Sequence, residues 1–430
     1  MKSVLQRFFN VRTEEVAPIL LAALYFFCIL TALQIVRPAR EALGMQRGIE
    51  AIRWLFTGTL VITLFVNPVF GWLVSRFRRL AFIAATNLFF AFNLLVFFAL
   101  LVLTPQAVGE TTGMVFYVWF SVFNLFSTMV FWALMADRFT LEQSKRIFGV
   151  IAVGGTLGAI AGPWLAGMLV EPLGTPALLL VAAGFLLLAI GAAWLVSHLQ
   201  PASAAEAPQA PASVAAQNQA VIGGSAWEGL SAVVRSPYLL GISSYVLIMT
   251  VTATFIYMTR LAMVDALGDT VDEQTQLFAW IDLMTQVTTL VLQAVVTGHI
   301  MKRFGVAVAL ALLPLVVSLG FIGLALAGSF TVLVMFEATF RAVQRAVTRP
   351  ARETLFTVVS REDKYKSKAV TDTFVYRGGD VLGAWTEGGV RALGFALAGL
   401  AALTIPLAVI WLGLGVWLGR QQEARAATPS

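Results

Sequence analysis

The chain has 430 residues, of which 59% are hydrophobic and only 12% are charged, and its mean hydropathy is +0.84. An ordinary soluble domain contains roughly 25% charged residues. So little polar surface excludes a soluble enzyme and a nucleic-acid-binding domain, in spite of the net charge of +6. The composition predicts an all-α polytopic membrane protein that is not an enzyme, lies in the lipid bilayer and binds no nucleic acid.

Stretches of about 20 apolar residues are long enough to cross a bilayer as helices. We expect about twelve spans, at residues 16–36, 54–75, 80–103, 113–136, 147–170, 176–197, 239–262, 277–300, 305–327, 329–350, 369–390 and 396–418. Cys28 is the only cysteine, and the two histidines lie about a hundred residues apart, at His198 and His299. We therefore expect no disulfide, no metal and no cofactor.

The stretch 199–225 is rich in Pro, Ala, Ser and Gln and has only one charged residue, which is typical of a flexible linker. Trp227 to Tyr238 then predicts an interfacial helix before the seventh span. We divide the chain into an N-terminal six-helix bundle (1–198), a cytoplasmic linker with an interfacial segment (199–237) and a C-terminal six-helix bundle (238–430).

Lys and Arg gather in the loops after spans two, four, eight and ten, whereas the alternate loops are neutral or acidic. The positive-inside rule then predicts that both termini are cytoplasmic. We expect a multi-pass monomer in a bacterial inner (plasma) membrane.

Short matches between the halves indicate an internal repeat. Ala42-Leu43-Gly44 returns as Ala266-Leu267-Gly268, and Gly154-Gly155 returns as Gly378-Gly379, both at an offset of 224. Gly71 to Phe77 resembles Gly298 to Phe304 at an offset of 227. Three matches at nearly one offset predict two pseudo-symmetric bundles, as in many secondary transporters. The small residues from Gly154 to Gly162 are typical of close helix packing.

Ionisable residues at bilayer depth normally face a cavity or a partner. In span ten a stripe of residues spaced by three or four positions contains mostly guanidinium groups, namely Glu337, Arg341, Arg345, Arg349 and Arg352. Arginine binds phosphate and carboxylate through paired hydrogen bonds, so this stripe predicts a small anionic solute. For Arg349 and Arg352 the alternative is that they only anchor the helix at the membrane surface.

Other charges allow two interpretations. Arg37 and Arg40 follow the first span on the outer side, against the positive-inside rule, which favours a role in binding, with Glu41 orienting their guanidiniums. Arg377 and Asp380 form either a fixed ion pair or a gate that opens during transport. Asp282 and Glu337 either carry protons or pair with an arginine.

Three motifs resemble the ATP/ADP translocase family of nucleotide exchangers, which belongs to the wider major facilitator group. Arg37-Pro-Ala-Arg40-Glu41 is similar to the family's Arg-x-x-Lys-Asp, and the segment with Glu142 and Lys145-Arg146-Ile-Phe148 is similar to its Glu-Ala-Lys-Arg-Phe. Arg349-Pro350-Ala-Arg352-Glu353, followed by Lys366-Ser-Lys368-Ala369, is similar to its Asp-Pro-x-Lys-Glu and Lys-Gly-Lys-Ala. The resemblance extends from about span one to span eleven.

The resemblance implies a nucleotide antiporter of the major facilitator type in which the basic residues at Arg40 and Arg352 hold phosphates. Two departures stand out: Arg replaces Lys at both positions, and Ile256-Tyr257-Met258-Thr259 stands where the family has a Glu. We expect substrate binding by Arg37, Arg40, Glu41, Arg341, Arg345, Arg349, Arg352 and Glu353. We expect gating or coupling by Glu142, Lys145, Arg377, Asp380, Asp282 and Glu337.

The sequence thus favours an alternating-access exchanger of a phosphorylated organic anion such as a nucleotide. A proton-coupled major facilitator exporter of drugs or metabolites is the first alternative, with Asp282 or Glu337 as the coupling carboxylate. A non-transporting membrane scaffold is the second alternative. A scaffold would explain why the motifs depart from the family pattern, but not why costly charges are retained inside the membrane.

Overall fold

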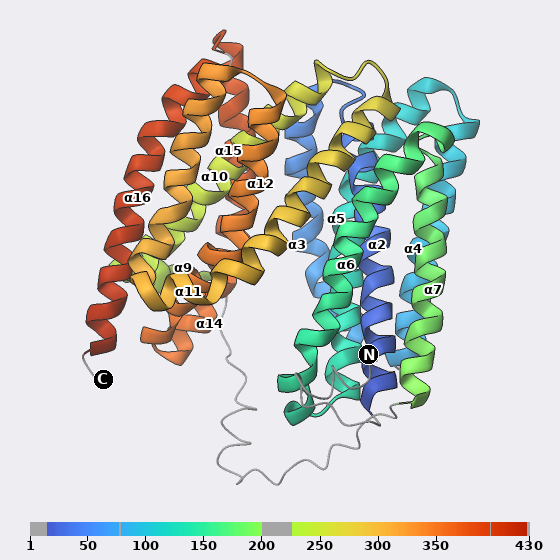
Figure 1. Cartoon of the computed structure of the whole chain (residues 1–430), viewed down its shortest axis with the longest axis horizontal. Coiled ribbons are helices and arrows are strands. Elements are labelled where there is room, and N and C mark those ends of the chain that lie inside the picture. Colours follow the sequence, from blue (N-terminus) through green and yellow to red (C-terminus); the bar gives the residue numbers. More distant parts are fainter. Residues whose placement is uncertain (1–14, 77–78, 200–225, 396, 428–430) are drawn as a thin grey trace. The chain divides into compact units, whose positions relative to one another are not determined.

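The computed structural model describes the backbone of residues 15–76, 79–199, 226–395 and 397–427 (Figure 1). It describes the side chains of these ranges apart from residues 67–76, 79–80, 141–142, 145, 226–229, 295–302, 361–362, 365, 369 and 397–398. Within the described ranges all regular secondary structure is helical, and ten helices are long and apolar enough to cross a membrane. The predicted fold class is confirmed. Residues 200–225 of the predicted linker lie outside the described residues.

The chain forms two compact units. Unit 1 consists of residues 1–218 and 264–283, and unit 2 consists of residues 219–263 and 284–430. Residues 264–283 thus pack with unit 1, although they follow the seventh predicted span. The division into two six-helix halves at the predicted boundaries stays a prediction.

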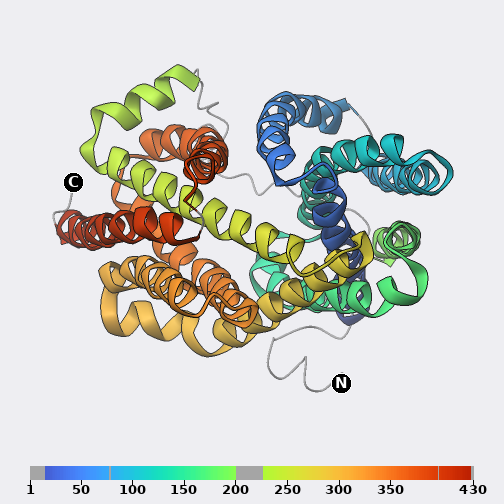
Figure 2. The same cartoon turned by 90° about the horizontal axis from the view of Figure 1, so that it is seen from above.

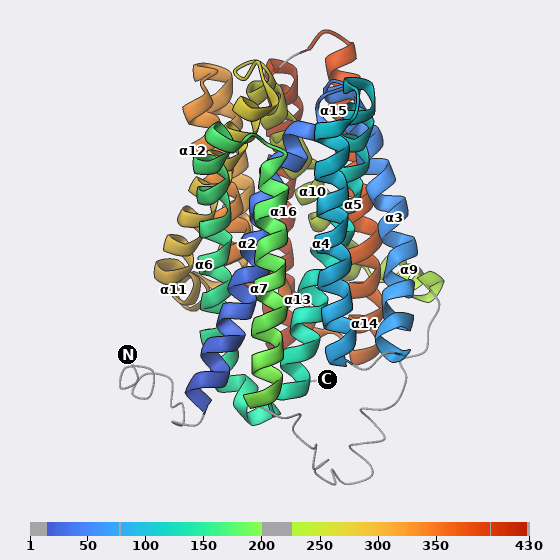
Figure 3. The same ribbon diagram turned by 90° about the vertical axis from the view of Figure 1, so that its right-hand side faces the viewer.

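Unit 1 contains six long helices, with α2 in contact with α5, α6 and α7 (Figure 2, α2 in dark blue) and α4 beside α7 (Figure 3). Their bounds are α2 Val16–Gly44, α3 Ile49–Arg76, α4 Arg79–Leu103, α5 Gln106–Arg138, α6 Leu141–Leu173 and α7 Ala177–Leu199. Helix α2 is longer than the predicted span, because it continues through Pro38 for two more turns to Gly44. Arg37, Arg40 and Glu41 therefore lie on this helix and not in a loop after it.

Glycines bring α6 against α2. A Cβ atom at Gly154 would collide with the Ala23 carbonyl, and one at Gly155 would collide with the Phe26 ring. This is the close packing that the small residues predict. In unit 2, Gly379 faces Thr250 in the same way. Both members of this second pair lie 224 positions after Gly155 and Phe26, so the sequence repeat corresponds to a repeated helix contact.

Unit 2 contains the rest of the helices, at α9 Ala226–Arg235, α10 Pro237–Asp265, α11 Val271–Ala327, α12 Phe330–Val343, α13 Arg349–Leu355, α14 Arg361–Val370, α15 Tyr376–Ala392 and α16 Leu397–Ala427. The first turns of α11 and the end of α10 group with unit 1. Helix α11 spans two predicted segments and is broken at Gly305, whose φ of 79° and ψ of 175° are not helical. The predicted interfacial segment contains a helix, α9, and its place at the membrane surface stays a prediction.

The tenth and eleventh predicted spans are not among the ten apolar helices, and each is interrupted by a π-helical turn. Turn η2 (Gln344–Thr348) joins α12 to α13, and turn η4 (Thr371–Val375) joins α14 to α15. A π turn accommodates an extra residue and is frequent at functional sites. These two segments also carry many of the charged residues of unit 2.

Candidate functional site

A polar cavity of about 620 Å³ lies within unit 2. It is lined by residues of α10, of the α12–η2–α13 segment and of the α14–η4–α15 segment, namely Met249, Arg341, Gln344, Arg345, Thr348, Arg349, Arg352, Glu353, Lys368, Asp372, Tyr376 and Arg377. Its size is typical of a pocket for a small organic molecule. Six lining side chains are cationic and two are acidic, which gives a formal excess of four positive charges.

The predicted arginine stripe supplies four of these cations. Arg341, Arg345, Arg349 and Arg352 all line the cavity, whereas Glu337 does not. Glu337 still lies on the same helical face as Arg341, one turn along, because their side chains are in contact at 2.8 Å. Its carboxylate is fully buried behind the cavity wall, between Arg341 and Arg260 of α10. Gln344, Arg345 and Thr348 belong to η2, so the π turn faces the cavity.

Carboxylates hold several of the cations in place. Arg352 Nη2 lies 3.2 Å from Asp372 Oδ1 and 3.8 Å from Glu353 Oε1, and Lys368 donates a hydrogen bond to Glu353. These contacts join α13 to α14 and η4. Burial raises the pKa of Glu353, but the hydrogen bond and charge of Lys368 and the charges of Arg352 and Arg349 outweigh it. The net pKa of Glu353 therefore lies below its ordinary value.

The deeper arginines have partners of their own. Arg341 Nη2 lies 2.8 Å from Glu337 Oε1, and Arg345 Nη1 donates a hydrogen bond of 2.8 Å to Gln286 Oε1 of α11. Arg349 is exposed, and among the described residues no carboxylate lies within ion-pair distance of it. Its guanidinium is therefore available to an anion in the cavity.

Arg377 lines the cavity from α15. Its Nη1 atom lies 3.5 Å from Asp380 Oδ2, one helical turn along. The predicted pair is thus present, with one member at the cavity. Whether it opens during transport stays a prediction.

The remaining predicted binding residues lie in unit 1. Arg37 Nε is 3.5 Å from Asp282 Oδ2 of α11, and Arg40 Nη1 is 2.8 Å from Glu41 Oε1. Arg40 also stacks 3.5 Å above the Tyr117 ring and donates from Nε to the Tyr117 carbonyl. Both predicted coupling carboxylates, Asp282 and Glu337, are thus ion-paired with arginine. This is the arrangement that the sequence left as the alternative to proton carriage.

The side chains of Glu142 and Lys145, at the start of α6, lie outside the described residues. Several cavity residues were not predicted as site residues, among them Gln344, Thr348, Lys368, Asp372 and Tyr376. Among these residues only Lys368 belonged to a sequence motif, because Lys366-Ser-Lys368-Ala369 resembles the Lys-Gly-Lys-Ala motif of the ATP/ADP translocase family. Asp372 and Tyr376 lie on a segment whose π turn has no sequence period of its own.

No group of three or more His, Cys, Asp or Glu side chains that could hold a metal ion occurs among the described residues. The cavity instead offers guanidinium, ammonium and amide donors. Such donors bind oxyanions, with guanidinium suited to two parallel hydrogen bonds.

The family model described as Major Facilitator Superfamily matches residues 19–343. Solved structures of similar fold include a mutant of the nucleoside transporter NupG, with a TM-score of 0.60, 14% identity, and coverage of 95% of this chain and 99% of that one. The structure of a bacterial homolog of the human lysosomal transporter Spinster has a TM-score of 0.61 and 13% identity, and the match covers 98% of this chain and 100% of that one. The structure of the POT family transporter PepTSo has a TM-score of 0.61 and 13% identity, and the match covers 95% of this chain and 97% of that one. These identities show likeness of fold alone, and no curated protein matches the chain.

Proposed function

Because the chain belongs to the Major Facilitator Superfamily, we propose that it is a secondary transporter that exchanges a phosphorylated organic anion, such as a nucleotide, by alternating access. The observation that carries this proposal is the cavity in unit 2, with its formal excess of four positive charges. A cavity lined by one sign of charge raises the local concentration of the opposite ion.

The number of cations favours phosphate over a single carboxylate. A phosphate monoester carries about −1.5 to −2 charge near neutral pH and presents three acceptor oxygens. Arg349 and Arg352 would each supply a two-pronged donor, and Lys368 a compact charge beside them. Met249 and Tyr376 offer less polar surface in the same cavity for the organic part of the solute.

The ion pairs suggest how binding would be coupled to movement. Arg352–Asp372 and Lys368–Glu353 join α13 to η4 and α14. An incoming phosphate would compete with these carboxylates for the same cations. Binding would thus exchange contacts between protein segments for contacts with solute, and a ligand shifts such an equilibrium by its differential affinity for the two states.

The finer features of the proposal come from the loop charges and the motifs. We place the protein in a bacterial inner membrane with both termini cytoplasmic, acting as a monomeric antiporter. Proton coupling is not favoured, because Asp282 contacts Arg37 and Glu337 contacts Arg260 and Arg341.

Thermal stabilisation of the purified full-length protein tests the proposal. The panel contains ATP, ADP, a sugar phosphate, inorganic phosphate and an uncharged drug, because a ligand bound only by the folded state raises the unfolding temperature as its concentration passes Kd. We expect stabilisation by phosphorylated compounds, weakened by about tenfold or more in Kd in Arg349→Gln and Arg352→Gln. Arg420→Gln, on the exposed surface of α16, is the matched control. Stabilisation only by an uncharged or cationic compound would refute the proposal and favour an exporter.

A further inference from the structure

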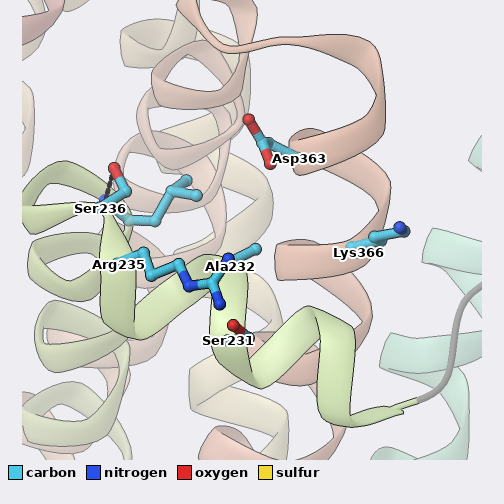
Figure 4. Close-up of a pocket in the computed structure, with 7 residues that line it drawn as sticks. Ser231, Ala232, Arg235, Ser236, Asp363 and Lys366 are labelled. Carbon is cyan, nitrogen blue, oxygen red and sulfur yellow. Dashed lines mark hydrogen bonds between the residues drawn. The ribbon is translucent and has the colours of Figure 1, made fainter.

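Helix α9 packs against α14 in unit 2 (Figure 3). A second polar cavity, of about 500 Å³, is lined by residues of both helices (Figure 4). It is lined by Ser231, Ala232, Arg235, Ser236, Leu239, Asp363 and Lys366. None of these residues lines the cavity assigned to the transported solute. The second cavity therefore needs an explanation of its own.

Helix α9 lies at a membrane boundary, since it ends at Arg235 and the apolar span α10 begins at Pro237. Leu230 and Val234, one turn apart, are 43% and 62% exposed, while Val233 is buried. A short helix with one exposed apolar face and one polar face is typical of the region between lipid headgroups and acyl chains. The same ten-residue helix thus carries the exposed apolar residues and part of the lining of the polar cavity.

The cavity combines cations with hydroxyl groups. Figure 4 shows Arg235 and Ser231 on α9, with Asp363 and Lys366 on α14. The Asp363 carboxylate accepts a hydrogen bond of 2.8 Å from Ser360 Oγ. Arginine provides a planar fork for an oxyanion. The Lys366 ammonium points away from α9 in Figure 4, so its flexible stem has to turn to bring the charge to a bound oxyanion.

The net charge of the cavity favours a phosphodiester over a phosphate monoester. Two cations and one carboxylate give the cavity a formal charge of +1. This value matches the single charge of a phosphodiester better than the −1.5 to −2 charge of a phosphate monoester. The apolar residues beside the cavity also match a ligand that carries acyl chains and not a free phosphate.

We propose that the cavity between α9 and α14 binds the phosphodiester headgroup of an anionic glycerophospholipid. Arg235 and Lys366 contact the phosphate, Ser231 and Ser236 donate hydroxyl hydrogen bonds, and the acyl chains lie over Leu230 and Val234. Basic pockets at the ends of membrane helices recognise lipid headgroups by the same chemistry. This site does not depend on the identity of the transported solute.

The experiment measures thermal stabilisation of the full-length protein by three probes: dioctanoyl-phosphatidylglycerol, dioctanoylglycerol and inorganic phosphate. Each is titrated against the parent protein, the double variant Arg235→Gln/Lys366→Gln and the matched double variant Lys364→Gln/Arg420→Gln. The residues of the matched variant do not line the cavity. We expect saturable stabilisation by the phospholipid, with Kd raised about tenfold or more in the cavity variant and unchanged in the matched variant.

Three results would overturn the proposal. Equal stabilisation by dioctanoylglycerol would show that the acyl chains alone are bound. Saturable binding of inorganic phosphate that the cavity variant abolishes, without binding of the phospholipid, would identify a free-phosphate site. Phospholipid binding that is equally strong in both double variants would place the lipid elsewhere. If the cavity variant does not fold, Arg235→Lys, which keeps the charge but loses the fork, is measured in its place and should weaken binding.

Discussion

Arg260 and Glu337 form an ion pair in unit 2, with Nη1 and Oε1 3.4 Å apart and both side chains fully buried. Arg260 lies on α10 and Glu337 on α12, and the same carboxylate oxygen is 2.8 Å from Nη2 of Arg341 at the cavity. The pair thus connects a buried charge to the wall of the proposed binding site. Arg260 is the one charged residue of the seventh predicted span, 239–262, and the sequence does not show that Glu337 is its partner.

Glu337→Gln should destabilise the protein strongly. The substitution removes a negative charge from beside a fully buried guanidinium, and breaking a buried pair from one side costs roughly 3–5 kcal/mol. We expect a lower unfolding temperature of the purified protein by light scattering or intrinsic fluorescence.

The double variant Arg260→Met/Glu337→Leu provides the control. Replacing both partners with apolar groups removes both fully buried charges, and Arg341 at the cavity loses the same partner in either variant. The double variant should therefore lie much closer in stability to the parent than Glu337→Gln does. A double variant as unstable as Glu337→Gln would show that packing and not charge explains the loss.

Gly154→Ala should weaken the contact between α2 and α6. The new Cβ atom collides with the backbone carbonyl of Ala23, which cannot move as a side chain can, and overpacking of this kind costs about 1–3 kcal/mol. Gly149→Ala on the same helix meets no atom within 4 Å. It should be neutral or stabilising by up to about 1 kcal/mol, because alanine favours helix. Equal unfolding temperatures for the two variants would contradict this packing account.

The stabilising contribution of Glu353 should depend on pH. Its pKa in the folded protein lies below the ordinary value, so its contribution is complete above the ordinary pKa of about 4.3 and is lost as the pH falls through the lowered folded value. The difference in unfolding temperature between the parent and Glu353→Gln should therefore shrink on acidification below that pH. In a Lys368→Gln background the dependence should be weaker, because the main hydrogen-bond donor is gone. If the difference in unfolding temperature grew on acidification, the pKa of Glu353 would lie above its ordinary value in the folded protein, which would contradict this account.

Much of the fold was predictable, because its determinants are local or periodic. Apolar runs located the helices, although α5 and α6 begin six or seven residues before the predicted spans. The offset of 224 relates Gly155 and Gly379, which make equivalent helix contacts. The extension of α2 to Gly44 was missed because a proline and three charged residues resemble a helix end in sequence.

The site was predictable only in part. The arginine spacing predicted one face of the cavity, since all four arginines follow a helical period. No spacing in the sequence predicted the π turns at 344–348 and 371–375, although Arg345 lies in the first of them. Partners such as Gln286 of Arg345 also lie far away in sequence. Pairings of this kind depend on tertiary packing, which no single-sequence pattern contains.

Counterflow exchange in proteoliposomes tests the central claim most directly. Vesicles containing the full-length protein are loaded with unlabelled nucleotide, or left empty, and uptake of labelled nucleotide is measured without a pH gradient. A phosphorylated-anion exchanger should give uptake that requires internal substrate and is reduced about tenfold or more in Arg349→Gln and Arg352→Gln but not in Arg420→Gln. No uptake of any phosphorylated compound, together with movement of a neutral or cationic solute driven by a pH gradient, would contradict the account.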